Sequence, residues 1–194
     1  MERFGISLYD AISVAIGTAG AVLLIKKSIW CWCCGMICNV MWLFLFMERS
    51  LLIAAGLQVT YFLFSGYGII RWRLERVQKP IPPLLEHTGT LIALAIFGLA
   101  VLKTRFTGLN SYCELLAVSL LIAANWLTAR QHRYCWYFWI SGDLVFGLFL
   151  WNAGIYALFL MQVIYFCLSV WGLIAWRKAN AIAAMDAPAQ DVDV

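Results

Sequence analysis

A chain of 194 residues of which 64% are hydrophobic and only 12% charged has too little polar surface to cover a soluble domain. Its formal net charge is +4, and the basic residues form no block of the kind that binds nucleic acid. Composition and charge therefore place the chain in a lipid bilayer.

Long uncharged apolar runs predict seven transmembrane helices, because a spanning helix needs about 20 apolar residues. The first five runs supply one helix each. The sixth is interrupted only by Asp143 and is divided in two by Asn152-Ala153-Gly154, a turn-forming stretch. The predicted helices cover residues 9–25, 29–47, 51–72, 88–103, 112–129, 134–151 and 155–176. Continuous apolar runs exclude the alternating strands of a barrel.

The sequence repeats itself at an offset of 104 residues. The pattern Gln-Val-x-Tyr-Phe-x-x-Ser-x-x-Gly-x-Ile-x-Trp-Arg of residues 58–73 returns without a gap at residues 162–177. The same offset pairs Asp10 with Glu114, Lys26 with Arg130, Cys31 with Cys135, Trp32 with Trp136, and Asn39 with Asp143. The chain therefore contains two copies of one unit.

Each copy contains three helices, so the chain leaves a copy on the side opposite to its entry. The fourth helix returns the chain across the membrane, and both copies insert in the same direction. We predict an all-α membrane protein with seven transmembrane helices in a 3+1+3 arrangement of parallel repeats, with a site between the repeats. The predicted parts are residues 1–78, 79–108 and 109–178, followed by a disordered cytoplasmic tail, 179–194.

The distribution of Lys and Arg predicts the orientation. Four lie on the side of the N-terminus (Arg3, Arg49, Lys103, Arg105) and ten on the other (Lys26, Lys27, Arg71, Arg73, Arg76, Lys79, Arg130, Arg133, Arg177, Lys178). The positive-inside rule makes the second side cytoplasmic, with the N-terminus outside and the C-terminus inside. A signal peptide in residues 1–25 is the competing interpretation, but the segment has no clear basic region before its apolar run.

Asp143 is the only charged residue between Arg133 and Arg177, near the middle of its predicted helix. An ionisable group at that depth needs a partner or a wet cavity. Trp136, Trp139 and Asp143 lie within about 60° on a helix at 100° per residue. Two indole rings and a carboxylate therefore share one strip. The alternative for either tryptophan, and more so for Trp136, is an aromatic belt at the membrane surface.

The first repeat has Trp32, Gly35 and Asn39 at the corresponding positions, so the predicted site is asymmetric. Two further polar faces occur once in each repeat. Their members lie within about 80° on a helix and either bind a ligand or join helices: Gln58, Tyr61, Ser65 and Trp72; Gln162, Tyr165, Ser169 and Trp176.

Among these residues, Gln58, Gln162 and Tyr165 are candidate ligand contacts, since an amide both donates and accepts hydrogen bonds. Asn125 and Asn39 join them, because an unpaired buried amide costs about 1–3 kcal/mol. The remaining small residues are predicted close-packing positions: Ser65, Gly68, Ser169 and Gly172. Asp10 and Glu114 start their helices and are predicted helix N-terminal partners or outer-gate residues.

The sequence offers no catalytic set, metal site or cofactor motif. His87 and His132 lie far from any nucleophile, and no phosphate-binding glycine loop is present. Cys31, Cys33, Cys34 and Cys38 would not converge on a metal from one helix and are predicted apolar fillers. No ATP-binding domain is encoded, so passive transport is the simplest function.

Several of these elements resemble the Pnu vitamin transporter family: Trp30-x-Trp32 after Lys26-Lys27, residues 55–62 and 68–72, and Trp136-x-x-Trp139-x-x-x-Asp143. The resemblance covers residues 9–178. It implies a SWEET-like 3+1+3 fold, a homotrimer in the bacterial inner membrane, and facilitated diffusion of nicotinamide riboside, which a cytoplasmic kinase then phosphorylates and traps. It also implies that the ligand contacts Trp136, Trp139 and Asp143, with Asn39, Gln58, Asn125 and Gln162 as polar partners.

Two features depart from the family or leave alternatives open. The family's proline after the second tryptophan of the second helix is replaced by Cys33-Cys34. Similar sequences carry thiamine or riboflavin, and thiamine's cationic ring also suits a carboxylate beside two indoles. A membrane-embedded enzyme would need converging acids, histidines or metal ligands. A light or small-molecule sensor would need a Schiff-base lysine or an output domain, and the seventh helix has no Lys before Lys178.

Overall fold

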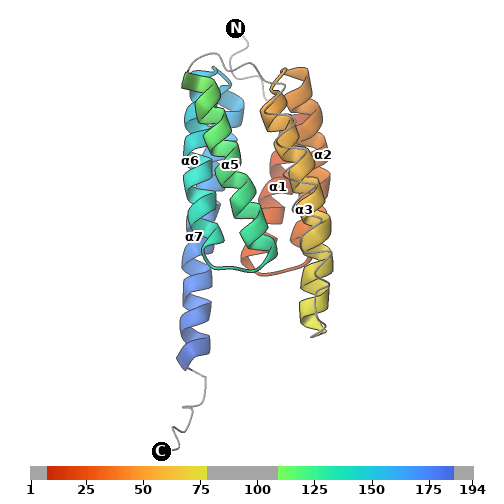
Figure 1. Ribbon diagram of the computed structural model, residues 1–194, viewed down its shortest axis with the longest axis vertical. Coiled ribbons are helices and arrows are strands. Elements are labelled where there is room, and N and C mark those ends of the chain that lie inside the picture. Colours follow the sequence, from red (N-terminus) through yellow and green to blue (C-terminus); the bar gives the residue numbers. More distant parts are fainter. Residues whose placement is uncertain (1–7, 78–108, 186–194) are drawn as a thin grey trace, which may run out of the picture.

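The computed structural model describes residues 8–77 and 109–185, and all six elements in these ranges are helices (Figure 1). They match six of the seven predicted spans to within a few residues, apart from longer C-terminal ends on two of them. The predicted helix 88–103 lies outside the described residues. The helices are α1 (Leu8–Ile25), α2 (Trp30–Glu48), α3 (Leu52–Arg76), α5 (Leu109–Ala129), α6 (Cys135–Asn152) and α7 (Tyr156–Met185).

Helix α7 is longer than predicted. It continues through Arg177 and Lys178 to Met185, so residues 179–185 of the segment predicted to be a disordered tail are helical. This correction has a local cause, because four of these seven residues are alanine, the strongest helix former. Apolarity defines where the chain leaves the membrane, but helix propensity carries the helix further.

Apolar surface covers the outside of the helices. α2, α3, α5 and residues 158–179 of α7 are long and apolar enough to cross a membrane, and α1 has a shorter apolar segment, Ala11–Ile25. Large side chains such as Phe44 and Leu148 are exposed, whereas polar Asn39 and Asp143 are buried. This reversal of the soluble pattern fits a multi-pass membrane protein.

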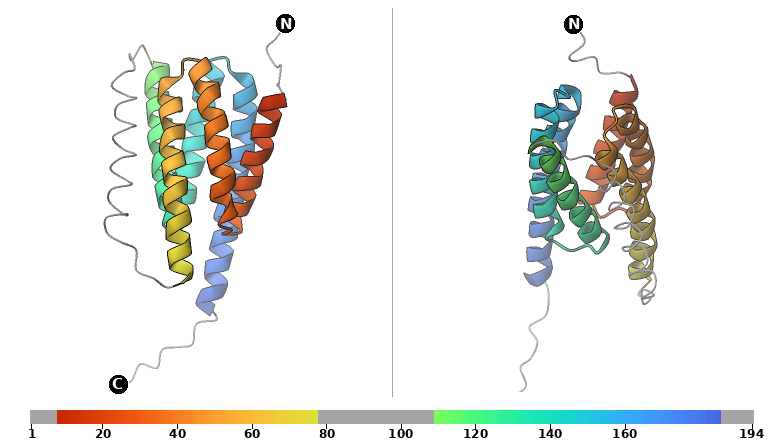
Figure 2. Two further views of the ribbon diagram at one scale, coloured as in Figure 1. Left: turned by 90° about the vertical axis from the view of Figure 1, so that its right-hand side faces the viewer. Right: turned by 45° about the horizontal axis from the view of Figure 1, so that its top comes forward.

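The described helices form two groups of three, which Figure 2 shows as separate units side by side. Within each group the middle helix packs on the other two: α2 on α1 and α3, and α6 on α5 and α7. The groups meet where α3 packs on α5 and where α1 packs on α7. α1 and α5 both begin at the end near the N label in Figure 1, so the groups run in the same direction.

The turns also repeat at the 104-residue offset. Lys27 and Gln131 both have a φ of 52°, and Ser50 (57°) corresponds to Gly154 (73°). In each turn the next residue donates its N–H to a carbonyl five residues earlier, the pattern of a Schellman motif at a helix end. These bonds are all 2.9 Å long: Ser28 to Leu23, His132 to Leu127, Leu51 to Phe46, and Ile155 to Leu150. Gly154 also confirms the predicted break between the last two helices.

Two indole groups join the units symmetrically. Trp72 Nε1 donates to the carbonyl oxygen of Ala129, at the end of α5, over 3.1 Å. Trp176 Nε1 donates to the carbonyl of Ile25, at the end of α1, over 3.0 Å. Since these carbonyls are orphan acceptors of helix C-termini, each bond satisfies a buried group and ties one unit to the other.

Two glycines make room for two tryptophans at equivalent positions. Trp32 packs edge-on against Trp72 over the backbone of Gly68, and a Cβ on Gly68 would collide with the Trp32 ring. A Cβ on Gly172 would collide in the same way with Trp136. The prediction that Gly68 and Gly172 are close-packing positions is therefore confirmed by the space around them.

We expect Gly68→Ala and Gly172→Ala each to destabilise the protein by about 1–3 kcal/mol, because the tryptophan ring must move. Gly66→Ala, on the same helix as Gly68, is the matched control. Its Cβ would meet no atom within 4 Å, so the gain in helix propensity should stabilise the protein by about 0.5–1 kcal/mol. Thermal unfolding of the purified variants in detergent measures both effects, and equal behaviour of Gly66→Ala and Gly68→Ala would contradict this packing.

Candidate functional site

A cavity of about 210 Å³ lies between the two units and is lined by residues of all six described helices. One water needs about 10–15 Å³ by this measure, so the cavity is large enough for a small organic molecule. Its wall is mostly apolar and aromatic with a few polar groups, as in small-molecule sites. The structure brings all eight predicted ligand contacts to this cavity: Asn39, Gln58, Asn125, Trp136, Trp139, Asp143, Gln162 and Tyr165.

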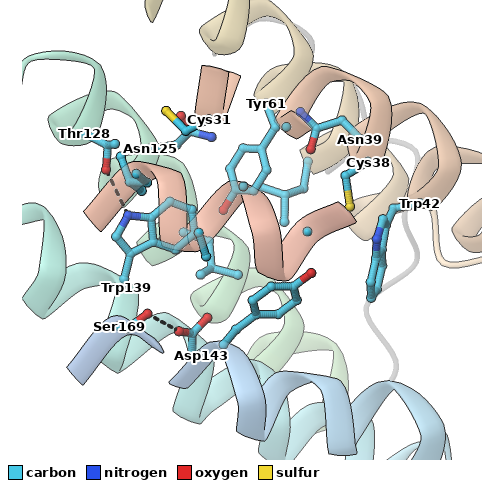
Figure 3. Close-up of a pocket in the computed structure, with 18 of the residues that line it drawn as sticks. Cys31, Cys38, Asn39, Trp42, Tyr61, Asn125, Thr128, Trp139, Asp143 and Ser169 are labelled. Atoms are coloured by element: carbon cyan, nitrogen blue, oxygen red, sulfur yellow. Dashed lines mark hydrogen bonds between the residues drawn. The ribbon is translucent and has the colours of Figure 1, made fainter. Parts of the chain in front are cut away.

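Asp143 is the charged group of the cavity wall and is only 3% exposed. Gln162 Nε2 donates to its Oδ1 over 2.5 Å. Ser169 Oγ donates to its Oδ2 over 2.7 Å, as Figure 3 shows. The described residues that line the cavity include no Lys, Arg or His. The carboxylate is therefore held by neutral donors and has no positive charge beside it, which favours a cation as its partner.

The structure corrects the prediction for Ser169. It was predicted to be a close-packing position like Ser65, but its hydroxyl holds Asp143. Ser65 differs, since its Oγ donates to the carbonyl of Tyr61 in its own helix over 2.8 Å. The sequence contained a signal for this role, because Ser169 shares a helical face with Gln162. Only the packing of α7 on α6 shows that this face meets Asp143.

Trp139 forms an aromatic wall of the cavity in a fixed orientation. Its Nε1 donates to Thr128 Oγ1 over 2.9 Å, and its ring packs edge-on against Tyr61 with centroids 5.8 Å apart (Figure 3). Sequence reasoning missed Thr128, because a threonine on an apolar helix carries no signal until its neighbour on the next helix is known. The indole face of Trp139 is thereby positioned for a flat ligand.

Trp136 also lines the cavity, and it is 3% exposed. It packs edge-on against Trp176 at 5.3 Å. A tryptophan of a membrane-surface belt would have its ring in the lipid headgroup region, so burial argues against that alternative for Trp136. The same contact repeats the Trp32–Trp72 pair of the first unit.

Four buried polar atoms of the cavity wall have no hydrogen-bond partner among the described residues. Two are indole donors, one is a hydroxyl, and one is an amide oxygen: Trp32 Nε1, Trp136 Nε1, Tyr61 OH and Asn125 Oδ1. A buried polar atom without a partner costs about 1–3 kcal/mol. A ligand with both donors and acceptors would recover part of this cost.

Glu114 lies elsewhere and has a structural role. It is buried on α5, and its carboxylate accepts the N–H of Ala54 in the first turn of α3 over 3.2 Å. The prediction that Glu114 starts its helix is wrong, because α5 begins at Leu109 and has no acidic residue in its first turn. Glu114 instead partners the N-terminus of α3, a helix of the other unit. The side chain of Asp10, its repeat counterpart, lies outside the part of the chain that the structure describes.

No group of three or more His, Cys, Asp or Glu residues is placed to hold a metal ion within residues 8–77 and 109–185. Cys31 and Cys38 are buried, free and part of the cavity wall, as fillers would be. Within these ranges the wall supplies one carboxylate, four amides and six aromatic side chains that carry a polar atom. That set suits binding by stacking and hydrogen bonding.

Comparison with known proteins gives two matches. The sequence model of the family described as "Nicotinamide mononucleotide transporter" matches residues 7–178. The chain is also similar to the solved structure titled "Crystal structure of the Vitamin B3 transporter PnuC", with 19% sequence identity and a TM-score of 0.67. The match covers 87% of this chain and 80% of the other and shows a shared fold. Comparison with curated protein sequences gives no match.

We expect Ser169→Ala to lower the free energy of unfolding by about 1–3 kcal/mol, because a buried carboxylate loses one of its two donors. Its repeat counterpart provides a matched control. Ser65→Ala removes only a hydrogen bond to the carbonyl four residues earlier and should change stability little. Thermal unfolding of both variants gives the comparison, and an equal loss in the two would show that the Asp143 bond contributes nothing beyond packing.

Proposed function

The chain belongs to the nicotinamide mononucleotide transporter family, and from this premise we propose that it imports nicotinamide riboside by facilitated diffusion. The observation that carries the proposal is the Asp143 carboxylate in an aromatic cavity without a neighbouring cation among the described residues. Nicotinamide riboside has a flat, positively charged ring. That ring can stack on Trp139 while its charge faces Asp143.

The cavity wall favours the riboside over the mononucleotide. A phosphate group carries close to two negative charges and is bound in proteins by Arg, Lys or a helix N-terminus. The described wall offers none of these basic side chains and one carboxylate. Like charges in a low-dielectric site repel strongly, so a phosphorylated ligand is disfavoured. The amide side chains and the hydroxyl groups of the wall can instead hydrogen-bond the neutral hydroxyls of a ribose.

Thiamine is the alternative ligand that shares the cationic ring. Riboflavin, a second alternative, has a neutral ring system and so gains nothing from Asp143. All three are flat and stack on aromatic rings, so aromatic lining does not separate them. Side-by-side titration of the purified protein with the three vitamins distinguishes them, because the true ligand raises the melting temperature most at equal concentration.

Metabolic trapping follows from the same electrostatics. Once a cytoplasmic kinase has phosphorylated the riboside, the product carries the charge that the cavity rejects, and it cannot return by the same route. Net uptake then needs no ion gradient and no ATP at the membrane protein itself. The kinase is a functional partner in this proposal, and the transporter performs no chemistry of its own.

The proposed topology places the chain in the bacterial inner membrane with its N-terminus outside and its C-terminus in the cytoplasm. The clustering of basic residues supports it. The turns after α1 and α5 and the ends of α3 and α7 lie together at the lower end in Figure 1. Most described Lys and Arg residues are in these segments, and Arg49 is at the opposite end. Three further features of the proposal come from the sequence and the resemblance: the predicted fourth helix, 88–103, the SWEET-like arrangement and the homotrimer.

We predict that liposomes containing the purified protein take up labelled nicotinamide riboside without ATP or an ion gradient. Uptake should stop when the concentrations inside and outside are equal, because no energy source is coupled. Enclosing a riboside kinase with ATP should then raise the total label accumulated. Uptake that collapses on addition of a protonophore would contradict the passive mechanism, and empty liposomes serve as the control.

We predict that Asp143→Asn weakens binding of nicotinamide riboside by about 10–100-fold, because the carboxylate charge beside the cationic ring is lost. The matched ligand is the reduced, dihydro form of the riboside, which has the same outline without the positive charge. Its binding should change little between the wild-type protein and the variant. Calorimetric titration measures both, and equal losses for the two ligands would show that Asp143 does not recognise charge.

A further inference from the structure

Tyr61 and Tyr165 are repeat counterparts that line the same cavity, but their hydroxyls have different surroundings. The Tyr165 hydroxyl occupies the space beside Gly17 on α1, and the thiol of Cys38 on α2 borders the same space. That thiol in turn donates to the carbonyl of Ser13 over 3.4 Å. The Tyr165 hydroxyl is therefore packed between α7 and the first unit.

The Tyr61 hydroxyl has no such place because the repeat is broken at the two positions that would form it. Leu121 stands where the first unit has Gly17, and Gly142 stands where it has Cys38. The Leu121 side chain fills the space next to Gly142, where an added Cβ would lie 2.6 Å from Leu121 Cδ2. The second unit thus offers Tyr61 neither the room nor the thiol that Tyr165 finds in the first.

As a result, the Tyr61 hydroxyl stays in the cavity. It is buried without a hydrogen-bond partner among the described residues. The ring packs edge-on against Trp139, and Asp143 lines the same cavity. In Figure 3 the hydroxyl points into the cavity, toward the side on which Asp143 and Trp139 lie. It is a phenolic donor and acceptor of the cavity wall whose hydrogen-bonding capacity is unused by the described residues.

We propose that Tyr61, and not its counterpart Tyr165, supplies the hydroxyl that hydrogen-bonds the ligand, at a neutral polar group next to the positively charged ring. This inference rests on the proposed function and deepens it. The ligand classes that fit are cationic heteroaromatic rings with a hydroxyl or carboxamide close to the charge. Duplication of the unit produced two tyrosines, and loss of the Gly and Cys partners in the second unit releases one of them for recognition.

The direct test compares Tyr61→Phe with two other changes that remove a single hydroxyl. Tyr61→Phe should bind nicotinamide riboside about ten-fold more weakly and should not lower the melting temperature of the ligand-free protein, since no internal bond is lost. Tyr165→Phe should lower that melting temperature and weaken binding less. Tyr67→Phe, whose hydroxyl accepts a bond from Arg71 outside the cavity, should bind the ligand as the wild type does.

The bonded ligand group is identified with two analogues, one without the ribose 2′-hydroxyl and one without the carboxamide. The analogue that lacks Tyr61's partner should bind wild-type protein about ten-fold more weakly than nicotinamide riboside does, and should bind Tyr61→Phe no worse than wild type. The inference is wrong if Tyr61→Phe weakens the binding of both analogues by the same factor as it weakens the binding of nicotinamide riboside.

The outcomes separate this inference from the proposed function. If wild-type protein does not bind nicotinamide riboside, the proposed function fails. If wild type and Tyr61→Phe bind it equally well, only the role of Tyr61 fails. A Tyr61→Phe protein that unfolds more easily without ligand would show that the hydroxyl has a packing role, and this too would overturn the inference.

Discussion

A carboxylate buried between two helical units is the constraint on which the cavity depends. Asp143 is held by Gln162 and Ser169, which come from the neighbouring helix of its own unit. An ionised group in a membrane interior is costly unless it is hydrogen-bonded and finds a counter-charge. The neutral donors fix its position, and the missing counter-charge among the described residues is what a cationic ligand supplies.

The contacts that join the two units are symmetric, whereas the residues that line the cavity are not. Trp72 and Trp176 make equivalent bonds across the interface, and all four described turns have the same backbone pattern. In the cavity the counterparts differ: Asn39 stands for Asp143, and Gly35 for Trp139. A duplicated scaffold keeps its packing, while divergence in the cavity creates a site for an asymmetric molecule.

The same principle explains the two tyrosines. Tyr61 and Tyr165 are the same residue at equivalent positions of the repeat. Their surroundings differ because the neighbouring residues diverged between the two units. The Tyr165 hydroxyl packs into the first unit beside Gly17, whereas the second unit closes the equivalent space with Leu121. Function in a duplicated protein can therefore change without substitution of the functional residue itself, through loss of the partner that had occupied it.

The sequence by itself determined the six described helices and the repeat, because apolar length, charge clusters and turn residues are local properties. It also identified eight of the residues that line the cavity, since polar side chains on apolar helices stand out at any depth. Only the tertiary structure decided that Ser169 and Thr128 are hydrogen-bonded to Asp143 and Trp139, and which tyrosine is free. These roles depend on a partner from another helix, and the distance between side chains on different helices is set by packing, which no local pattern encodes.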